Sequence, residues 1–218
     1  MSADLIETLP LPQRLALSYA PRQAHAPTLA LLALDTRLAG IVRSGGEPVI
    51  AQMKLAWWRE RFGQSQAEWP LGEPLLALLR ESGIEHARMA PLVDGWEALL
   101  SEQLGRSELA AFSRGRALAW AAVGDAAGNS ASNEPVERAA RAWALADLAL
   151  NLGEASEADL TRAALRAEVG TGVRLPRQLR SLAVLYGLAN RAIAAGTNDM
   201  LDGPAAMVVA LRIGLLGR

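Results

Sequence analysis

Five basic side chains lie between residues 37 and 61, and their types and spacing suit the binding of a phosphate group. They are Arg37, Arg43, Lys54, Arg59 and Arg61. An arginine guanidinium pairs with two phosphate oxygens at once, so this stretch could hold an anionic ligand. The alternative is that these side chains form surface salt bridges, because Glu47 and Glu60 lie among them.

Asp147 and Asn151 form a second candidate group. They are four residues apart, which places both side chains on one face of a helix. Carboxylate oxygens suit magnesium, but asparagine carries no charge, so this pair would bind a metal weakly. Asp35 offers another carboxylate, yet no acidic residue follows it four positions later. The alternative role for Asp147 is that of a solvated or capping residue on an amphipathic helix.

Two adjacent tryptophans, Trp57 and Trp58, belong to the same basic stretch. Adjacent side chains on a helix point about 100° apart, so only one of the two rings can face the centre of the core. The other ring must reach a neighbouring helix or a groove. We therefore expect either packing roles for both rings or one ring that lines a ligand pocket.

The segments that must position these groups are predicted to be helices. Apolar residues recur three and four positions apart from Thr28 until Gly45-Gly46, and again from Val49 to Phe62. We expect these two helices to form an antiparallel pair. Seven to nine helices are predicted in all, and the later ones cover residues 74–82, 89–104, 108–124, 135–152, 157–167, 178–195 and those after Pro204.

The composition predicts an all-α fold. Hydrophobic residues make up 51% of the 218 residues, and most of them are Ala and Leu, which lose little side-chain freedom in a helix. A chain of this length supports one well-buried core. We expect residues 1–27, which contain four prolines, to form an N-terminal segment, and residues 28–218 to form a single helical bundle.

Charge and cysteine content exclude several classes of function. The 22 basic and 23 acidic residues give a net charge of -1, so nucleic-acid binding is not expected. Cysteine is absent, which excludes disulfides and thiolate chemistry. No apolar stretch reaches the length of a membrane span, and the start of the chain does not resemble a signal peptide, so we expect a cytoplasmic protein. Residues 205–216 could still lie on a membrane surface.

Several segments together resemble the squalene/phytoene synthase family. Residues 34–43, followed by Met53–Phe62 with its Trp-Trp-Arg sequence, are similar to the family's first aspartate-rich helix and the helix after it. Residues 92–100, 108–128, 140–152 and Arg174-Leu-Pro176 follow in the same order as the family's middle and later segments. The resemblance covers roughly residues 28–190.

The resemblance implies a helical bundle of the isoprenoid synthase type. In that fold two facing aspartate motifs hold magnesium and the diphosphate of the substrate. At the first motif this chain has Ala39, Gly40 and Arg43 where the family has acidic residues. At the second, the later acidic positions fall near Leu152 and Gly153, so only Asp147 with Asn151 remains.

The leading hypothesis is therefore a divergent, non-catalytic member of this family without a cofactor. It would bind a prenyl lipid or act as a protein partner, since a branch of the family with similarly eroded motifs serves in the assembly of respiratory complexes. One alternative is an active transferase that condenses two prenyl diphosphates head to head and uses magnesium. The other is a structural helical module with no ligand.

Overall fold

The computed structural model describes residues 2–44, 47–168 and 174–217. Within these ranges the chain forms eleven α-helices and no strand, so the predicted all-α class is confirmed. The α-helices are α1 (Ser2–Thr8), α2 (Leu11–Leu17), α3 (Arg22–Arg43), α4 (Pro48–Gly63), α5 (Pro74–Glu81), α6 (Ala90–Ala98), α7 (Arg106–Ala126), α8 (Glu134–Asn151), α9 (Ala155–Glu168), α10 (Arg180–Ala195) and α11 (Gly203–Leu211). Short turns precede α6 and α10, and a π-helical turn, η4 (Arg212–Leu216), continues α11.

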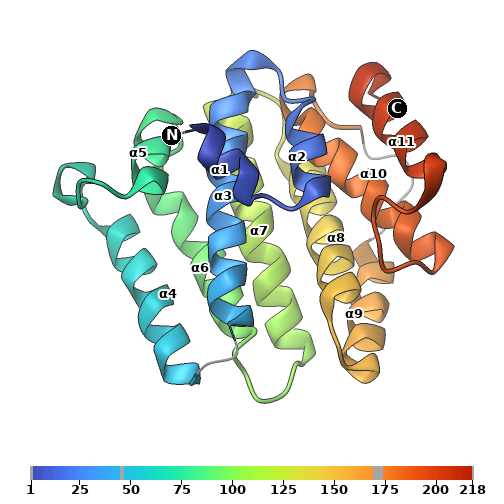
Figure 1. Ribbon diagram of the computed structural model, residues 1–218, viewed down its shortest axis with the longest axis horizontal. Coiled ribbons are helices and arrows are strands. Elements are labelled where there is room, and N and C mark those ends of the chain that lie inside the picture. The colour runs from blue at the N-terminus through green and yellow to red at the C-terminus, as the bar shows by residue number, and fades with distance from the viewer. Residues whose placement is uncertain (1, 45–46, 169–173, 218) are drawn as a thin grey trace.

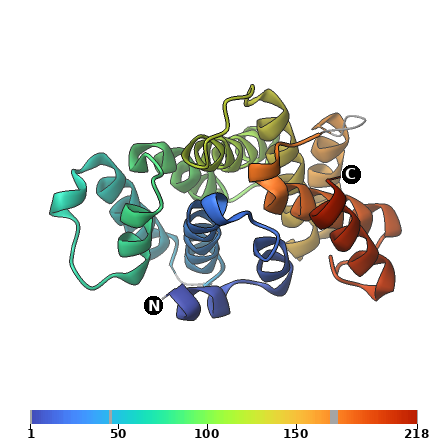
Figure 2. The ribbon, with the colours of Figure 1, turned by 90° about the horizontal axis from the view of Figure 1, so that it is seen from above.

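The helices α6, α7, α8 and α9 form a row in which each packs against the next. Helices α4 and α5 lie at one end of this row, and α10 and α11 lie at the other (Figure 1). Seen from above, α3 runs near the centre, with α1 and α2 on one side of it and α6 and α7 on the other (Figure 2). The middle of the molecule is therefore where α3, α7 and α8 meet.

The distribution of apolar residues explains why α3 is central and α4 is peripheral. In α3, apolar residues surround the helix axis, and five leucines between residues 29 and 38 are at most 2% exposed. In α4, one stripe alone is buried, formed by Ala51, Leu55, Trp58 and Phe62. Helix α4 runs antiparallel to α3, as predicted, but its buried stripe packs largely against α6 (Figure 1).

Three details of the predicted elements are wrong. The long helix α3 begins at Arg22 rather than Thr28, so Pro27 lies inside it and removes one backbone hydrogen bond. The ring of Pro27 is buried, and this packing offsets the lost bond. The helix predicted at 89–104 ends at Ala98, before polar residues 101–103. The described residues contain eleven α-helices, whereas seven to nine were predicted.

The predicted end of the first long helix, Gly45-Gly46, lies outside the described residues. In the ranges that the structure covers, no helix combines the length and the apolar character that crossing a bilayer requires.

Helices α6 and α7 cross very closely because glycines line their contact. A Cβ atom at Gly95 would lie 3.1 Å from the Cα atom of Phe112. A Cβ atom at Gly115 would overlap the backbone carbonyl of Pro91. Only glycine permits this separation of the two backbones.

The variant Gly115→Ala is expected to lower the free energy of unfolding by about 3 kcal/mol, because the added methyl group forces α6 and α7 apart. The matched control is Gly40→Ala on α3, where a Cβ atom meets no other atom within 4 Å. This change should stabilise the protein by about 0.5–1 kcal/mol, since alanine favours a helix. Urea unfolding of both variants measures the difference, and equal stabilities would contradict the close crossing.

Candidate functional site

A buried arginine joins two aspartates at the centre of the bundle. Arg116 on α7 and Asp35 on α3 are each 2% exposed, and no other charged residue is buried in the described ranges. Nε of Arg116 donates to Oδ1 of Asp35 over 3.0 Å, and Nη2 lies 2.8 Å from Oδ2. On its other side, Nη1 donates to Oδ2 of Asp147 on α8 over 2.7 Å. One guanidinium thus ties α3 and α8 to α7.

Aromatic rings enclose this guanidinium. Its central carbon lies 4.5 Å from the ring centroid of Trp143, 4.8 Å from that of Phe112 and 5.1 Å from that of Trp96. The indole Nε1 of Trp96 also donates to Oδ1 of Asp35 over 2.8 Å. The rings therefore stabilise the cation by cation–π contact and exclude water from its ion pair with Asp35.

Burial and the charges of neighbouring groups shift the pKa values of Asp35 and Arg116 in opposite directions. Burial raises the pKa of the Asp35 carboxyl above its usual value, although the charge and hydrogen bonds of Arg116 oppose this shift. For Arg116, burial opposes the charge, but the nearby carboxylates of Asp35 and Asp147 outweigh it and raise the pKa further. Arg116 therefore stays charged at neutral pH.

The arrangement does not suit a magnesium ion. The guanidinium of Arg116 occupies the space in which a cation would have to lie to contact both Asp35 and Asp147. Asn151, the predicted partner of Asp147, donates its side-chain amide to the backbone oxygen of Asp147 over 2.8 Å. Among the described residues, no group of three or more His, Cys, Asp or Glu side chains could hold a metal ion.

Two small hollows flank Asp147, and Arg43 and Asn151 line both of them. The larger has a volume of about 230 Å³ and is also lined by Gln13, Thr36 and other polar residues. The smaller has a volume of about 160 Å³ and extends toward Trp96. Three predicted site residues therefore come together here, around openings that are smaller than a typical ligand pocket.

Two other predicted residues, Arg37 and Lys54, line a separate hollow of about 350 Å³ between α1, α3, α4 and α5. Arg37 is half exposed and lies 3.5 Å from a carboxylate oxygen of Glu73. The floor of this hollow is apolar and includes Ile41 and Leu75. These two cations thus lie in a different place from Asp147 and Arg43.

The remaining predicted residues lie on α4. Arg59 pairs with Asp94 over 2.7 Å and with Glu97, and both acids belong to α6. The ring of Trp58 is buried, whereas the ring of Trp57 is 36% exposed and meets it edge to face. Arg59 and Trp58 therefore hold α4 against α6, whereas Trp57 faces outward.

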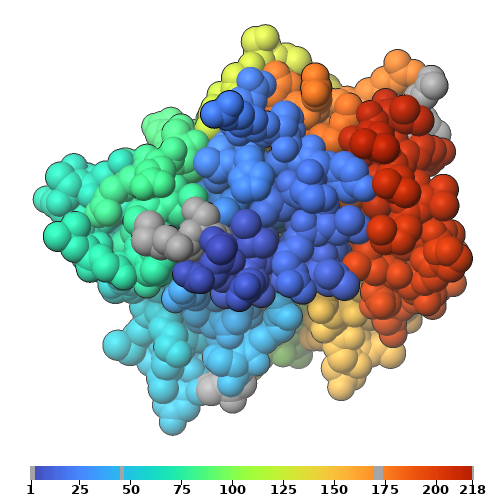
Figure 3. Space-filling view, turned by 45° about the horizontal axis from the view of Figure 1, so that its top comes forward, coloured from blue at the N-terminus to red at the C-terminus, as the bar shows by residue number. Residues whose placement is uncertain are grey.

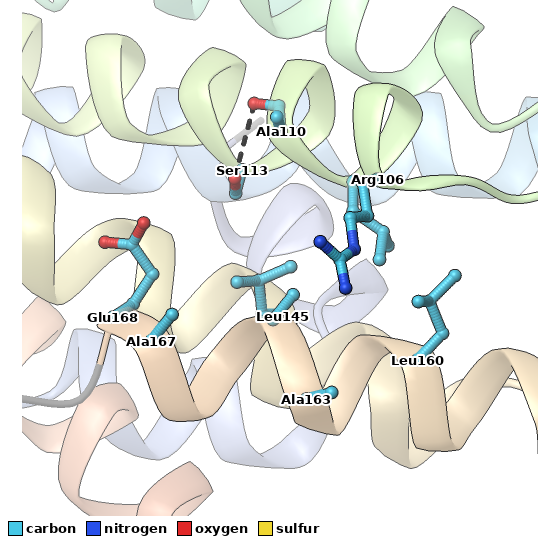
Figure 4. Close-up of a pocket in the computed structure, with 10 residues that line it drawn as sticks. Arg106, Ala110, Ser113, Leu145, Leu160, Ala163, Ala167 and Glu168 are labelled. Atoms are coloured by element: carbon cyan, nitrogen blue, oxygen red, sulfur yellow. Dashed lines mark hydrogen bonds between the residues drawn. The ribbon is translucent and has the colours of Figure 1, made fainter.

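Another hollow of about 350 Å³ lies between α7 and α9, away from all the predicted residues. Leu145, Leu160 and a row of alanines form its floor, and Glu168 closes one end through an ion pair with Arg141. Figure 4 shows the side chain of Arg106 extending from α7 over this hollow. The side chain of Arg106 makes no hydrogen bond or ion pair with any residue that the structure describes.

Neither Arg116 nor Trp96 was among the predicted site residues, although the sequence contains a signal for Arg116. Leu109, Phe112, Trp120 and Val123 form the apolar stripe of α7, and position 116 lies on that stripe. A charged residue at a position with this spacing must be buried and must have a partner. No signal in the sequence identifies that partner, because Asp35 lies 81 residues away.

No protein-family model, no curated protein and no solved structure matches this chain. The resemblance to the squalene/phytoene synthase family therefore stays a prediction.

The variant Arg116→Met should destabilise the fold by about 3–5 kcal/mol, because it leaves Asp35 buried without a counter-charge. The control is Arg59→Met, which removes a partly exposed pair and should cost at most about 1 kcal/mol. Urea unfolding at neutral pH compares the two. Equal costs would show that Arg116 does not hold the three helices together.

The penalty of Arg116→Met should also depend on pH. Without Arg116, burial raises the pKa of Asp35 in the folded state further above its unfolded value near 3.8. A raised pKa contributes stability below the unfolded value, and this contribution is lost as pH rises through the folded value. The variant should therefore be less impaired at pH 4 than at pH 7, and adding Asp35→Asn should remove this difference.

Proposed function

We propose that this protein is a divergent, non-catalytic protein of the squalene/phytoene synthase type that binds another protein. The observation that carries the proposal is the position of Arg116 between Asp35 and Asp147. The two carboxylates that could face a magnesium diphosphate are instead paired with a cation of the protein itself. Ionisation of an allylic diphosphate depends on metal ions that neutralise the leaving group.

The size of the central openings supports the same proposal. The isoprenoid synthase fold uses a large apolar cavity, but Arg116, Trp96 and Trp143 fill the space between α3 and α8. The hollow beside them has a volume of about 230 Å³ and a polar lining. Pockets that enclose ligands usually measure about 300–1,000 Å³, so a prenyl chain has no place at this point.

The surface that favours a protein partner lies on α4. Val49, Ile50, Met53 and Trp57 fall on one face of the helix and are 60%, 48%, 68% and 36% exposed. Such a contiguous apolar stripe on a surface marks a binding site. Lys54 borders it and forms no ion pair with any described residue. The partner segment that would fit this surface is a helix with an apolar face and with acidic residues that can pair with Lys54.

A photo-reactive amino acid at position 53 tests this surface in cells. We expect it to form a cross-link to one protein, through a peptide that combines apolar and acidic residues. The change Lys54→Glu should reduce the yield about tenfold, because it repels those acids. The control places the same probe at Leu71, which is 92% exposed and lies on a loop. Equal yields from both positions, or none from position 53, would contradict the proposal.

A prenyl lipid is the second candidate, and the hollow between α7 and α9 favours it. There the guanidinium of Arg106, which pairs with none of the described residues, lies beside an apolar floor, and this arrangement suits a single chain with an anionic head group. The volume of about 350 Å³ is within the range of ligand pockets. This hollow is separate from α4, so the two candidates are tested independently.

Incubation with magnesium and labelled farnesyl or geranylgeranyl diphosphate separates the catalytic and lipid-binding alternatives. We expect no product above a blank, and turnover would overturn the non-catalytic proposal. Binding without turnover would support the second candidate if Arg106→Ala weakens it about tenfold. Arg114→Ala is the matched control, since Arg114 is an exposed arginine on the same helix that does not line the hollow.

A further inference from the structure

The helix α11 and the turn η4 expose an unusual amount of apolar surface. Met207, Val208, Leu211, Leu215 and Leu216 are between 44% and 69% exposed. They lie along one side of the segment, together with Pro204, Ala205 and Arg212. We call these eight residues the α11 face. Figures 1 and 3 show the segment, in red, along one edge of the molecule.

The opposite side of α11 is firmly packed. Ala206 and Ala210 are fully buried, and Val209 and Ile213 lie against Gly187 of α10. Nη1 of Arg180 on α10 also donates to the backbone oxygen of Ile213 over 3.1 Å. The segment is therefore apolar on both sides, but the described residues cover only one of them. A helix that is apolar all round is normally buried, so the α11 face requires a cover.

The charges around the face identify the cover. From Gly203 to Gly217 the chain contains no acidic residue, and the exposed side chain of Arg212 belongs to the face. Arg180 lies on the packed side of the segment, beneath η4, and adds a positive charge there. Asp199 and Asp202 are the nearby acids in the sequence, and both precede the helix. An apolar surface with cations matches a bilayer whose head groups are anionic.

The charge of the face argues against a second copy of the chain as its cover. In a two-fold symmetric pair the face would meet itself, and Arg212 would then be covered without an acidic partner, because residues 203–217 contain no acid. A bilayer needs no complementary shape, and long cationic side chains such as Arg212 can reach the head groups while neighbouring apolar side chains insert. We propose that the α11 face docks on the surface of an anionic membrane, with the helix axis in the plane of the interface.

Co-sedimentation of the full chain with vesicles tests the proposal. Vesicles of phosphatidylglycerol and phosphatidylcholine in equal parts should carry the protein down, and vesicles of phosphatidylcholine alone should bind it more weakly. The double variant Val208→Glu/Leu215→Glu should bind at least about tenfold more weakly, because two inserted side chains become charged. Both positions are more than 60% exposed, so its circular dichroism and Tm should match those of the parent.

The matched control is Leu71→Glu, which adds the same charge at a side chain that is 92% exposed and far from α11 in the sequence. It should bind vesicles like the parent. The proposal is overturned if the parent does not bind anionic vesicles, or if the double variant binds as well as the parent. It is also overturned if sedimentation equilibrium finds a dimer that the double variant dissociates, because a second copy then covers the face.

Discussion

The ion pairs of Arg116 are the interaction on which the centre of this protein depends. A charged group without water must be paired almost completely, and Arg116 meets this demand with Asp35 on α3 and Asp147 on α8. Each of the three helices contributes one charged residue to these ion pairs, so no helix can shift without leaving a charge unpaired in the apolar core. The glycines that bring α6 close to α7 place Trp96 where its indole can complete the hydrogen bonding of Asp35.

The same ion pairs decide what chemistry the centre can perform. Two facing carboxylates on separate helices are a common basis for binding divalent cations, and their attraction for a metal comes from uncompensated negative charge. Here a guanidinium supplies the compensation internally, and three aromatic rings surround it. The carboxylates of Asp35 and Asp147 therefore retain little uncompensated charge with which to attract a metal ion, and their ion pairs with Arg116 hold α3, α7 and α8 together.

The proposed binding surfaces lie instead at the periphery. Helix α4 and helix α11 each bury one side and expose apolar side chains on the other. They occupy opposite ends of the row of helices, so a partner on α4 and a membrane at α11 would not compete for space (Figure 1). The hollow beneath Arg106 lies on a third part of the molecule, between α7 and α9. A rigid centre suits this organisation, since it keeps the three surfaces at fixed distances and orientations relative to one another.

The sequence by itself determined the helical class, most helix positions and the absence of acids at Ala39, Gly40 and Arg43, because helical periodicity and local composition are properties of neighbouring residues. It also indicated Asp147 and Asn151, which line the same two hollows, although the Asn151 amide bonds the backbone oxygen of Asp147 and not its carboxylate. The remaining predicted residues were treated as one basic stretch with two tryptophans, and in the structure they lie at three separate sites. Only the tertiary structure decided that Arg116 joins Asp35 to Asp147, since this contact spans residues that no local pattern relates.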